Sequence, residues 1–155
     1  MISPEILRRF QFFSGLDDNQ LKGLAMVAEE REAAAESTLF EEGSPAAKLY
    51  LLLEGSIDLY IKSEEANDPT SRRDFAVGEI NPGEMFGLSA LLEPYKCKVT
   101  ARVPLPGKMI EFDGASLRAL MQVDRGLASQ LMYQTAKTLM ERLISTRVQL
   151  AAAWA

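Results

Sequence analysis

The densest group of residues with the chemistry of a binding site is a glycine-rich segment near the middle of the chain. From Asn81 to Leu92 the sequence reads Asn-Pro-Gly-Glu-Met-Phe-Gly-Leu-Ser-Ala-Leu-Leu, in which Gly83 and Gly87 bracket an aromatic residue. Glycines at such a turn let backbone N–H groups converge, and a short helical turn that begins near Leu88 points its free N–H groups outward. The pattern predicts a site for an anion, typically phosphate, unless the turn has a purely structural role.

A second group of candidate residues follows this segment. Lys96 and Lys98 flank Cys97, the only cysteine of the chain. Because side chains alternate along a strand, the two lysines share one face, while Tyr95 and Cys97 share the other. The lysines neutralise a phosphate if their face is inward, and are two solvated surface lysines if it is not. Neighbouring positive charge lowers the pKa of a reactive thiol, but we favour a small buried strand residue as the interpretation of Cys97.

The composition excludes most enzyme chemistry. The chain has no histidine, so it cannot build a Ser-His-Asp triad, a histidine general base or a His-ligated metal site, and a jelly-roll metalloenzyme of the cupin kind is disfavoured for the same reason. One cysteine forms neither an internal disulfide nor a Cys-rich zinc site. We therefore predict a protein that is not an enzyme, with no catalytic residues, no metal site and no cofactor.

The charge balance argues against nucleic acid and membranes as direct partners. Lys and Arg number 17 against 22 Asp and Glu, a net charge of −5, whereas nucleic acid and anionic lipid attract basic proteins. No run of 18 apolar residues occurs without a charge, and Glu5, Arg8 and Arg9 interrupt the first ten residues, where a secretory signal would be apolar. We expect a cytoplasmic protein.

The chain divides into three zones that differ in their pattern of apolar and polar residues. Its length of 155 residues indicates one single domain. Residues 1–36 are expected to be helical, with a capping box between Asp17 and Gln20. Residues 37–112 contain short apolar runs punctuated by Gly, Pro and Asn, which predicts a small β-barrel or sandwich, preferably a jelly roll. Residues 113–155 are expected to be helical again. The expected strands are 49–53, 56–61, 75–80, 98–103 and 108–112, and the polar stretch 62–74 is expected to be an exposed loop.

The last zone is dominated by one long helix. Asp113 is expected to cap a short helix over 114–122, and Asp124 a helix from Arg125 to about Ala152. One stripe on this helix has the 4-3-4-3-4 spacing of a two-stranded coiled coil and consists of Met132, Ala136, Leu139, Leu143, Thr146 and Leu150. A second row is left to pack on the barrel and consists of Leu131, Met140, Ile144 and Val148. We expect homodimerisation through helix 125–152, unless the first stripe itself packs on the barrel.

The motifs resemble one known family. Gly83-Glu84-Met85-Phe86-Gly87, followed by Ser89-Ala90-Leu91-Leu92, resembles the phosphate-binding cassette of the cyclic-nucleotide-binding domain family, which includes catabolite activator proteins and protein kinase A regulatory subunits. Further motifs agree in order, namely Phe13-Ser14-Gly15-Leu16, Leu39-Phe40-Glu41-Glu42-Gly43 and Leu49 to Tyr60 with Gly55. The resemblance covers roughly residues 10–150. It implies a mainly β fold with flanking helices, an eight-stranded jelly-roll barrel or double-stranded β-helix, in which ligand binding repositions the long C-terminal helix.

The resemblance also implies a ligand, cAMP or cGMP, and a cassette over residues 82–99. Members of the family usually carry a second glutamate, which binds the ribose 2′-hydroxyl, where this chain has Leu88, and an arginine, which pairs with the phosphate, where it has Tyr95. Losing two such contacts costs about 3–6 kcal/mol, or about 10²- to 10⁴-fold in affinity, unless Lys96 or Lys98 compensates. The candidate binding residues are Gly83, Glu84, Phe86, Gly87, Leu88, Ser89, Ala90, Tyr95, Lys96, Cys97 and Lys98.

Two functions remain open. The first is a regulatory sensor that binds a cyclic nucleotide or a related phosphate-bearing small molecule and signals through its C-terminal helix, near Arg142 and Leu143, where the family's base-contacting hydroxyls fall. The second is a degenerate fold that no longer binds ligand and serves as a dimerisation or protein-interaction module. Because the sequence stops at Ala155, where activators of the family continue into a helix-turn-helix, we expect the output to pass through an unidentified protein partner and not directly to DNA.

Overall fold

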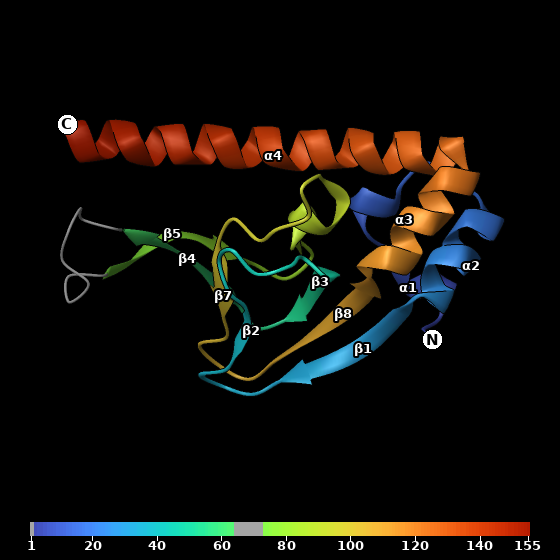
Figure 1. The fold of residues 1–155 in the computed structure, drawn as a ribbon, viewed down its shortest axis with the longest axis horizontal. Helices are drawn as coiled ribbons and strands as arrows, with labels where there is room; N and C mark the ends of the chain where they lie inside the picture. The colour runs from blue at the N-terminus through green and yellow to red at the C-terminus, as the bar shows by residue number, and fades with distance from the viewer. Residues whose placement is uncertain (1, 64–72) are drawn as a thin grey trace.

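The chain folds as a β-barrel flanked by helices, in a computed structural model that describes residues 2–63 and 73–155 (Figure 1). Two antiparallel sheets of four strands each form the barrel, in the orders β1-β8-β3-β6 and β2-β7-β4-β5. The strands are β1 (Ala28–Ala33), β2 (Thr38–Phe40), β3 (Lys48–Glu54), β4 (Ile57–Ser63), β5 (Arg73–Ile80), β6 (Met85–Phe86), β7 (Thr100–Arg102) and β8 (Gly107–Asp113). The predicted eight-stranded jelly roll with flanking helices is confirmed.

Helices α1, α2 and α3 gather at one end of the barrel, and α4 runs from that end along the length of the molecule (Figure 1). The helical elements are α1 (Pro4–Arg8), the 3₁₀ turn η1 (Gln11–Phe13), α2 (Asp18–Met26), the 3₁₀ turn η2 (Leu88–Leu91), α3 (Gly114–Val123) and α4 (Arg125–Trp154). The expected capping box at Asp17 and Gln20 is formed by both of its hydrogen bonds, 3.0 and 2.8 Å. Asp113 accepts a hydrogen bond from the Ser116 N–H, and Asp124 accepts one from the Leu127 N–H, each at 3.0 Å. Both aspartates are therefore N-caps, as predicted. None of the helices formed by the described residues combines the length and apolar character that a bilayer crossing requires.

Strand β1 corrects the prediction that residues 1–36 are helical. The sequence Ala-Glu-Glu-Arg-Glu-Ala has high helix propensity, yet residues 28–33 pair in antiparallel register with β8, from Ala28 opposite Phe112 to Ala33 opposite Gly107. Ion pairs cross the two strands, including Arg31 with Glu111 at 3.2 Å. Tertiary pairing therefore outweighs the local preference for helix.

Two hydrophobic clusters hold the fold together. The first lies between the helices and the sheet of β1, β8, β3 and β6, and includes Leu51, Phe112 and Leu131. The second lies between the two sheets, where the rings of Tyr50 and Phe86 stack with their centroids 4.8 Å apart. Burial of such side chains, at about 25 cal/mol per Å² of apolar surface, is the main force that closes the barrel.

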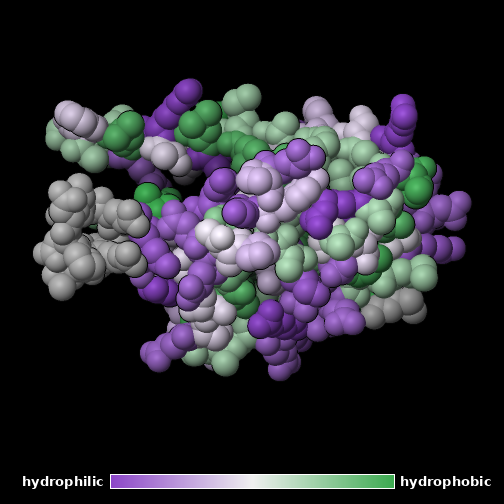
Figure 2. Space-filling model, in the orientation of Figure 1, coloured by the Kyte–Doolittle hydropathy of each residue, from purple (hydrophilic) through white to green (hydrophobic). Residues whose placement is uncertain are grey.

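The buried side chains of helix α4 end at Thr135, and the prediction of which row of side chains packs on the barrel is wrong. Leu131 is buried, but Met140, Ile144 and Val148, which were to pack on the barrel, are 60%, 54% and 64% exposed. Figure 2 shows hydrophobic surface gathered along this helix. As for the expected loop 62–74, residues 62–63 and 73–74 belong to β4 and β5, and residues 64–72 lie outside the described part of the chain.

Gly87 is the glycine on which the position of the cassette turn depends. Its φ is +74°, in the left-handed region that favours glycine, and an added Cβ would lie 2.9 Å from the Lys48 carbonyl oxygen and 3.0 Å from the Tyr50 ring. Gly83 is also left-handed, with φ +90°, but an added Cβ there would meet nothing within 4 Å.

This difference allows a matched test of the turn. Gly87→Ala should lower the free energy of unfolding by about 2–4 kcal/mol, because overlap with a strand adds to backbone strain, whereas Gly83→Ala should lose only about 1–2 kcal/mol from strain. Urea denaturation followed by circular dichroism measures both values. Equal losses in the two variants would contradict the close packing of Gly87.

Candidate functional site

A cavity of about 580 Å³ lies between the second half of α4 and the barrel. The sheet of β4 and β5 supplies its floor through Leu59, Val77 and Gly78, with Val99 beside them, and the turn that opens the cassette supplies Asn81 and Glu84. Helix α4 supplies the roof, which consists of Thr138, Glu141, Arg142, Ser145, Thr146 and Gln149. The cavity therefore has a floor that is apolar except for Glu79 and a polar roof, the mixture that binds a small organic molecule and orients it.

The opening turn of the cassette is fixed by hydrogen bonds to β3 and within itself. The Gly83 N–H donates to the Leu52 carbonyl at 2.8 Å, and the Leu52 N–H donates to the Glu84 carbonyl at 3.0 Å. The Glu84 carboxylate accepts the Asn81 N–H at 3.0 Å. One oxygen of Glu84 thus steadies the turn, while the residue also lines the cavity.

The glycine-rich segment continues into η2, whose side chains belong to the core. Leu88 is 5% exposed and Ala90 is fully buried in the cluster beneath the helices. Leu88 does not line the α4 cavity, so it does not obstruct it. Within the described residues, the N–H groups of Leu88 and Ser89 have no hydrogen-bond partner, as the first turn of a helix requires.

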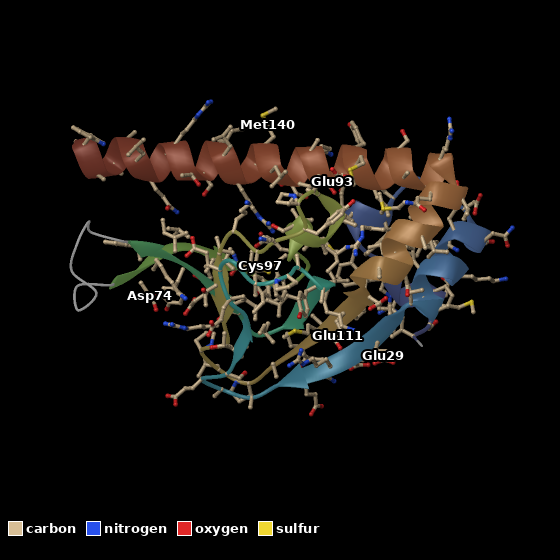
Figure 3. The ribbon with its side chains drawn as sticks, in the orientation of Figure 1. Glu29, Asp74, Glu93, Cys97, Glu111 and Met140 are labelled. Atoms are coloured by element: carbon tan, nitrogen blue, oxygen red, sulfur yellow. The ribbon has the colours of Figure 1, made fainter. Side chains whose placement is uncertain are left out.

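The end of the cassette is paired with the chain before β3. The Ala46 N–H donates to the Tyr95 carbonyl and the Cys97 N–H to the Ser44 carbonyl, both at 2.8 Å. Cys97 is buried, as expected (Figure 3), and burial raises the pKa of its thiol. The expected strand 98–103 is shorter, since β7 begins at Thr100, so residues 96–98 do not form the predicted strand with alternating faces. Lys96 and Lys98 are exposed, and neither lines the α4 cavity. Their binding role stays a prediction.

Arg142 is the residue of α4 that reaches the cassette. Its guanidinium donates a hydrogen bond to the Met85 carbonyl, 57 residues away in sequence. Burial lowers the pKa of Arg142, while the charges of Glu84 and Glu141 raise it. A second cavity, of about 380 Å³, shares Glu84 and Glu141 with the first and lies toward η1. Sequence reasoning noted the position of Arg142 but not this contact, which no local pattern encodes.

Comparison with known proteins shows the family. Residues 30–124, more than half of the chain, match the Cyclic nucleotide-binding domain. The chain belongs to the cyclic nucleotide-binding domain family. A solved structure from Geobacter metallireducens GS-15, named as a cyclic nucleotide-binding protein, shares 36% identity and a TM-score of 0.79, over 92% of this chain and 99% of that one.

Two curated relatives are much longer proteins. The CRP-like cAMP-activated global transcriptional regulator of Mycobacterium tuberculosis is 22% identical over 87% of this chain and 58% of its own length. A protein named as a potassium channel, from Rhodopseudomonas palustris, is 22% identical over 84% of this chain and 30% of its own length. The cyclic nucleotide-binding domain described here thus spans less than two thirds of both.

Arg118 joins α3 to the cassette of this cyclic nucleotide-binding domain. Its guanidinium lies over the Tyr95 ring, 4.3 Å from the centroid, and donates to the Ala90 carbonyl at 2.7 Å. Tyr95 occupies the position where the family resemblance places a phosphate-binding arginine. In this structure its ring instead makes a packing contact with Arg118.

No group of three metal-ligating side chains occurs among the residues described.

Removing the contact of Arg118 with Tyr95 and the Ala90 carbonyl should make the cassette less rigid. In Arg118→Gln, the amides of residues 90–95 should exchange hydrogen faster, and unfolding should become easier by about 1–3 kcal/mol, because a stacked cation and a hydrogen bond are lost. Hydrogen exchange with mass spectrometry measures the local effect. Arg125→Gln, at an exposed position on α4, is the control, and equal exchange in the two variants would argue against the contact.

Proposed function

We propose that this domain is a regulatory, non-catalytic sensor that binds a cyclic nucleotide, or a related phosphate-bearing small molecule, between the barrel and α4. The observation that carries the proposal is the α4 cavity, because its walls come from the sheet, the cassette turn and α4 together. An occupant would therefore contact both the cassette and the helix, and its binding would alter the packing of α4. We place the sensor in the cytoplasm, on the sequence grounds given above.

The chemistry of the walls suits a nucleotide. About 580 Å³ lies within the 300–1,000 Å³ typical of small-molecule sites. The apolar floor formed by Leu59, Val77 and Val99 suits the flat face of a base, and hydroxyl and amide side chains on α4 suit its polar edge. The free N–H groups of Leu88 and Ser89, with the remaining cassette residues identified from the sequence, stay candidate contacts for the ligand.

Calorimetric titration with cAMP and cGMP up to millimolar concentration tests the sensor. Because two charge-assisted contacts of the family are replaced, we expect the dissociation constant to lie toward the millimolar range, about 10²-fold or more above the micromolar affinity of a sensor that keeps both contacts. Ser145→Trp should abolish binding by filling the cavity from its roof, while Ser129→Trp, exposed on the same helix, should not. Absence of heat with the native protein, or native affinity in Ser145→Trp, would contradict the proposal.

The outward face of α4 favours a second role, association with another copy of the domain. Tyr133, Leu143 and Leu150 are 58%, 46% and 57% exposed, and Figure 3 shows Met140 on the side of the helix away from the barrel. These side chains recur at the spacing of a coiled-coil seam, and a shallow apolar groove of about 260 Å³ runs beside Tyr133 and Met140. This row differs from the seam predicted from the sequence, in which Met132 packs against the core and Thr146 lines the α4 cavity. We propose a homodimer through α4, which would persist even in a domain that had lost its ligand.

Sedimentation velocity tests the dimer. Leu143→Glu should convert the dimer to a monomer, because it places a charge in the seam of each helix. Leu105→Glu is the matched control, since Leu105 is an equally apolar, exposed side chain in the loop between β7 and β8. A native protein that sediments as a monomer would refute the dimer without bearing on ligand binding.

A further inference from the structure

Arg142 is the cationic side chain of the α4 cavity. Among the described residues that line the cavity, the others are apolar, amide, hydroxyl or carboxylate side chains. The guanidinium is half-buried and its recorded hydrogen bond goes to the neutral Met85 carbonyl. In the part of the chain that the structure describes, no carboxylate oxygen lies within 4.0 Å of it.

Glu84 and Glu141 act on the half-buried Arg142 guanidinium through their charge but form no ion pair within 4.0 Å, so its capacity to bind an anion directly is unused. Its five N–H donors form a planar fork that matches a carboxylate or a phosphate, and the Met85 carbonyl accepts from this fork as a neutral group. Burial lowers the pKa of Arg142, which is the cost that an anionic partner would remove. The residue is thus placed to receive a negatively charged group inside the cavity.

The cassette itself offers no comparable cation. Tyr95, at the position of the family's arginine, stacks on Arg118, and Arg118 is already bonded to the Ala90 carbonyl. Lys96 and Lys98 are exposed and lie outside the cavity lining. A positive charge that could bind an anion is therefore supplied to the cavity by Arg142 of α4 and not by the cassette.

The acidic residues of the cavity restrict the charge of its ligand. Glu79, Glu84 and Glu141 line it together with Arg142, and all three are exposed enough for water to screen them. Arg142 can neutralise one negative charge on a ligand, whereas a second charge would be repelled by the three carboxylates. The same carboxylates accept hydrogen bonds from hydroxyl or N–H donors, so a phosphodiester monoanion that also carries sugar hydroxyls and a base fits the wall chemistry.

We infer that Arg142, on α4, provides the anion-binding contact of this domain in place of the cassette arginine, and that the surrounding carboxylates make the site prefer one negative charge on its ligand to two. This inference rests on the proposed function. Because the fork of Arg142 also bonds the Met85 carbonyl, a phosphate that recruits it changes the contact between α4 and the cassette. Binding and helix position are coupled through one side chain.

Variants at two arginines of α4 test the contact. In calorimetry with cAMP, Arg142→Gln should bind about 10- to 100-fold more weakly, and Arg142→Lys should fall between it and the native protein, because lysine keeps the charge without the fork. Arg147→Gln, which removes an equal charge from an exposed site on the same helix, should stay within about twofold. The doubly charged 5′-AMP should bind the native protein more weakly than cAMP. Thermal melting checks that each variant is folded.

A second measurement separates this inference from the proposed function. In ¹H–¹⁵N spectra of the native protein, dimethyl phosphate, a monoanionic diester without base or sugar, should shift the Arg142 Nε–H signal, identified by its absence in Arg142→Lys. A shift without any binding of cAMP or cGMP would refute the sensor but support the anion site. Native cAMP affinity in Arg142→Gln would overturn the inference and leave the sensor standing. No shift and no cyclic-nucleotide binding would overturn both.

Discussion

The polarity of the α4 face that looks toward the barrel is the constraint on which the site depends. Through Leu131 and Thr135 the helix is buried against the rest of the protein, but beyond them Thr138, Arg142 and Gln149 take the positions that face the sheet. Apolar side chains there would collapse onto Leu59 and close the space, since a dry void is costly. Polar side chains at these positions leave the space open, and Arg142 donates a hydrogen bond from it to the Met85 carbonyl.

The cassette of this domain is largely a structural element. Leu88 and Ala90 belong to the core, Gly87 fits closely against β3, and Arg118 holds Tyr95 from the side of α3. These contacts hold the turn in place without any bound ligand. Beside the cassette, α4 contributes a half-buried cation, Arg142, and most of the polar side chains that line the cavity.

Local signals explain what could be predicted from the sequence. The helix caps, the buried Cys97 and the jelly roll follow from short-range patterns or from motifs in a familiar order. Strand β1 could not be predicted, because its residues prefer helix and become a strand only opposite β8. The rotation of α4 about its axis, which exposes Ile144, and the contacts of Arg118 and Arg142, made to residues 28 and 57 positions away, are decided by tertiary packing alone.

Helix α4 is buried at its N-terminal end and largely exposed over the rest of its length, so a small rotation at its buried end would displace its C-terminal end much further. Its first third is clamped in the core as far as Thr135, and the remaining 19 residues to Trp154 extend as a stiff rod about 28 Å long. A pivot of about 10° at Thr135 displaces the tip by about 5 Å. A small adjustment near Thr135 would therefore become a displacement of several ångströms at Trp154.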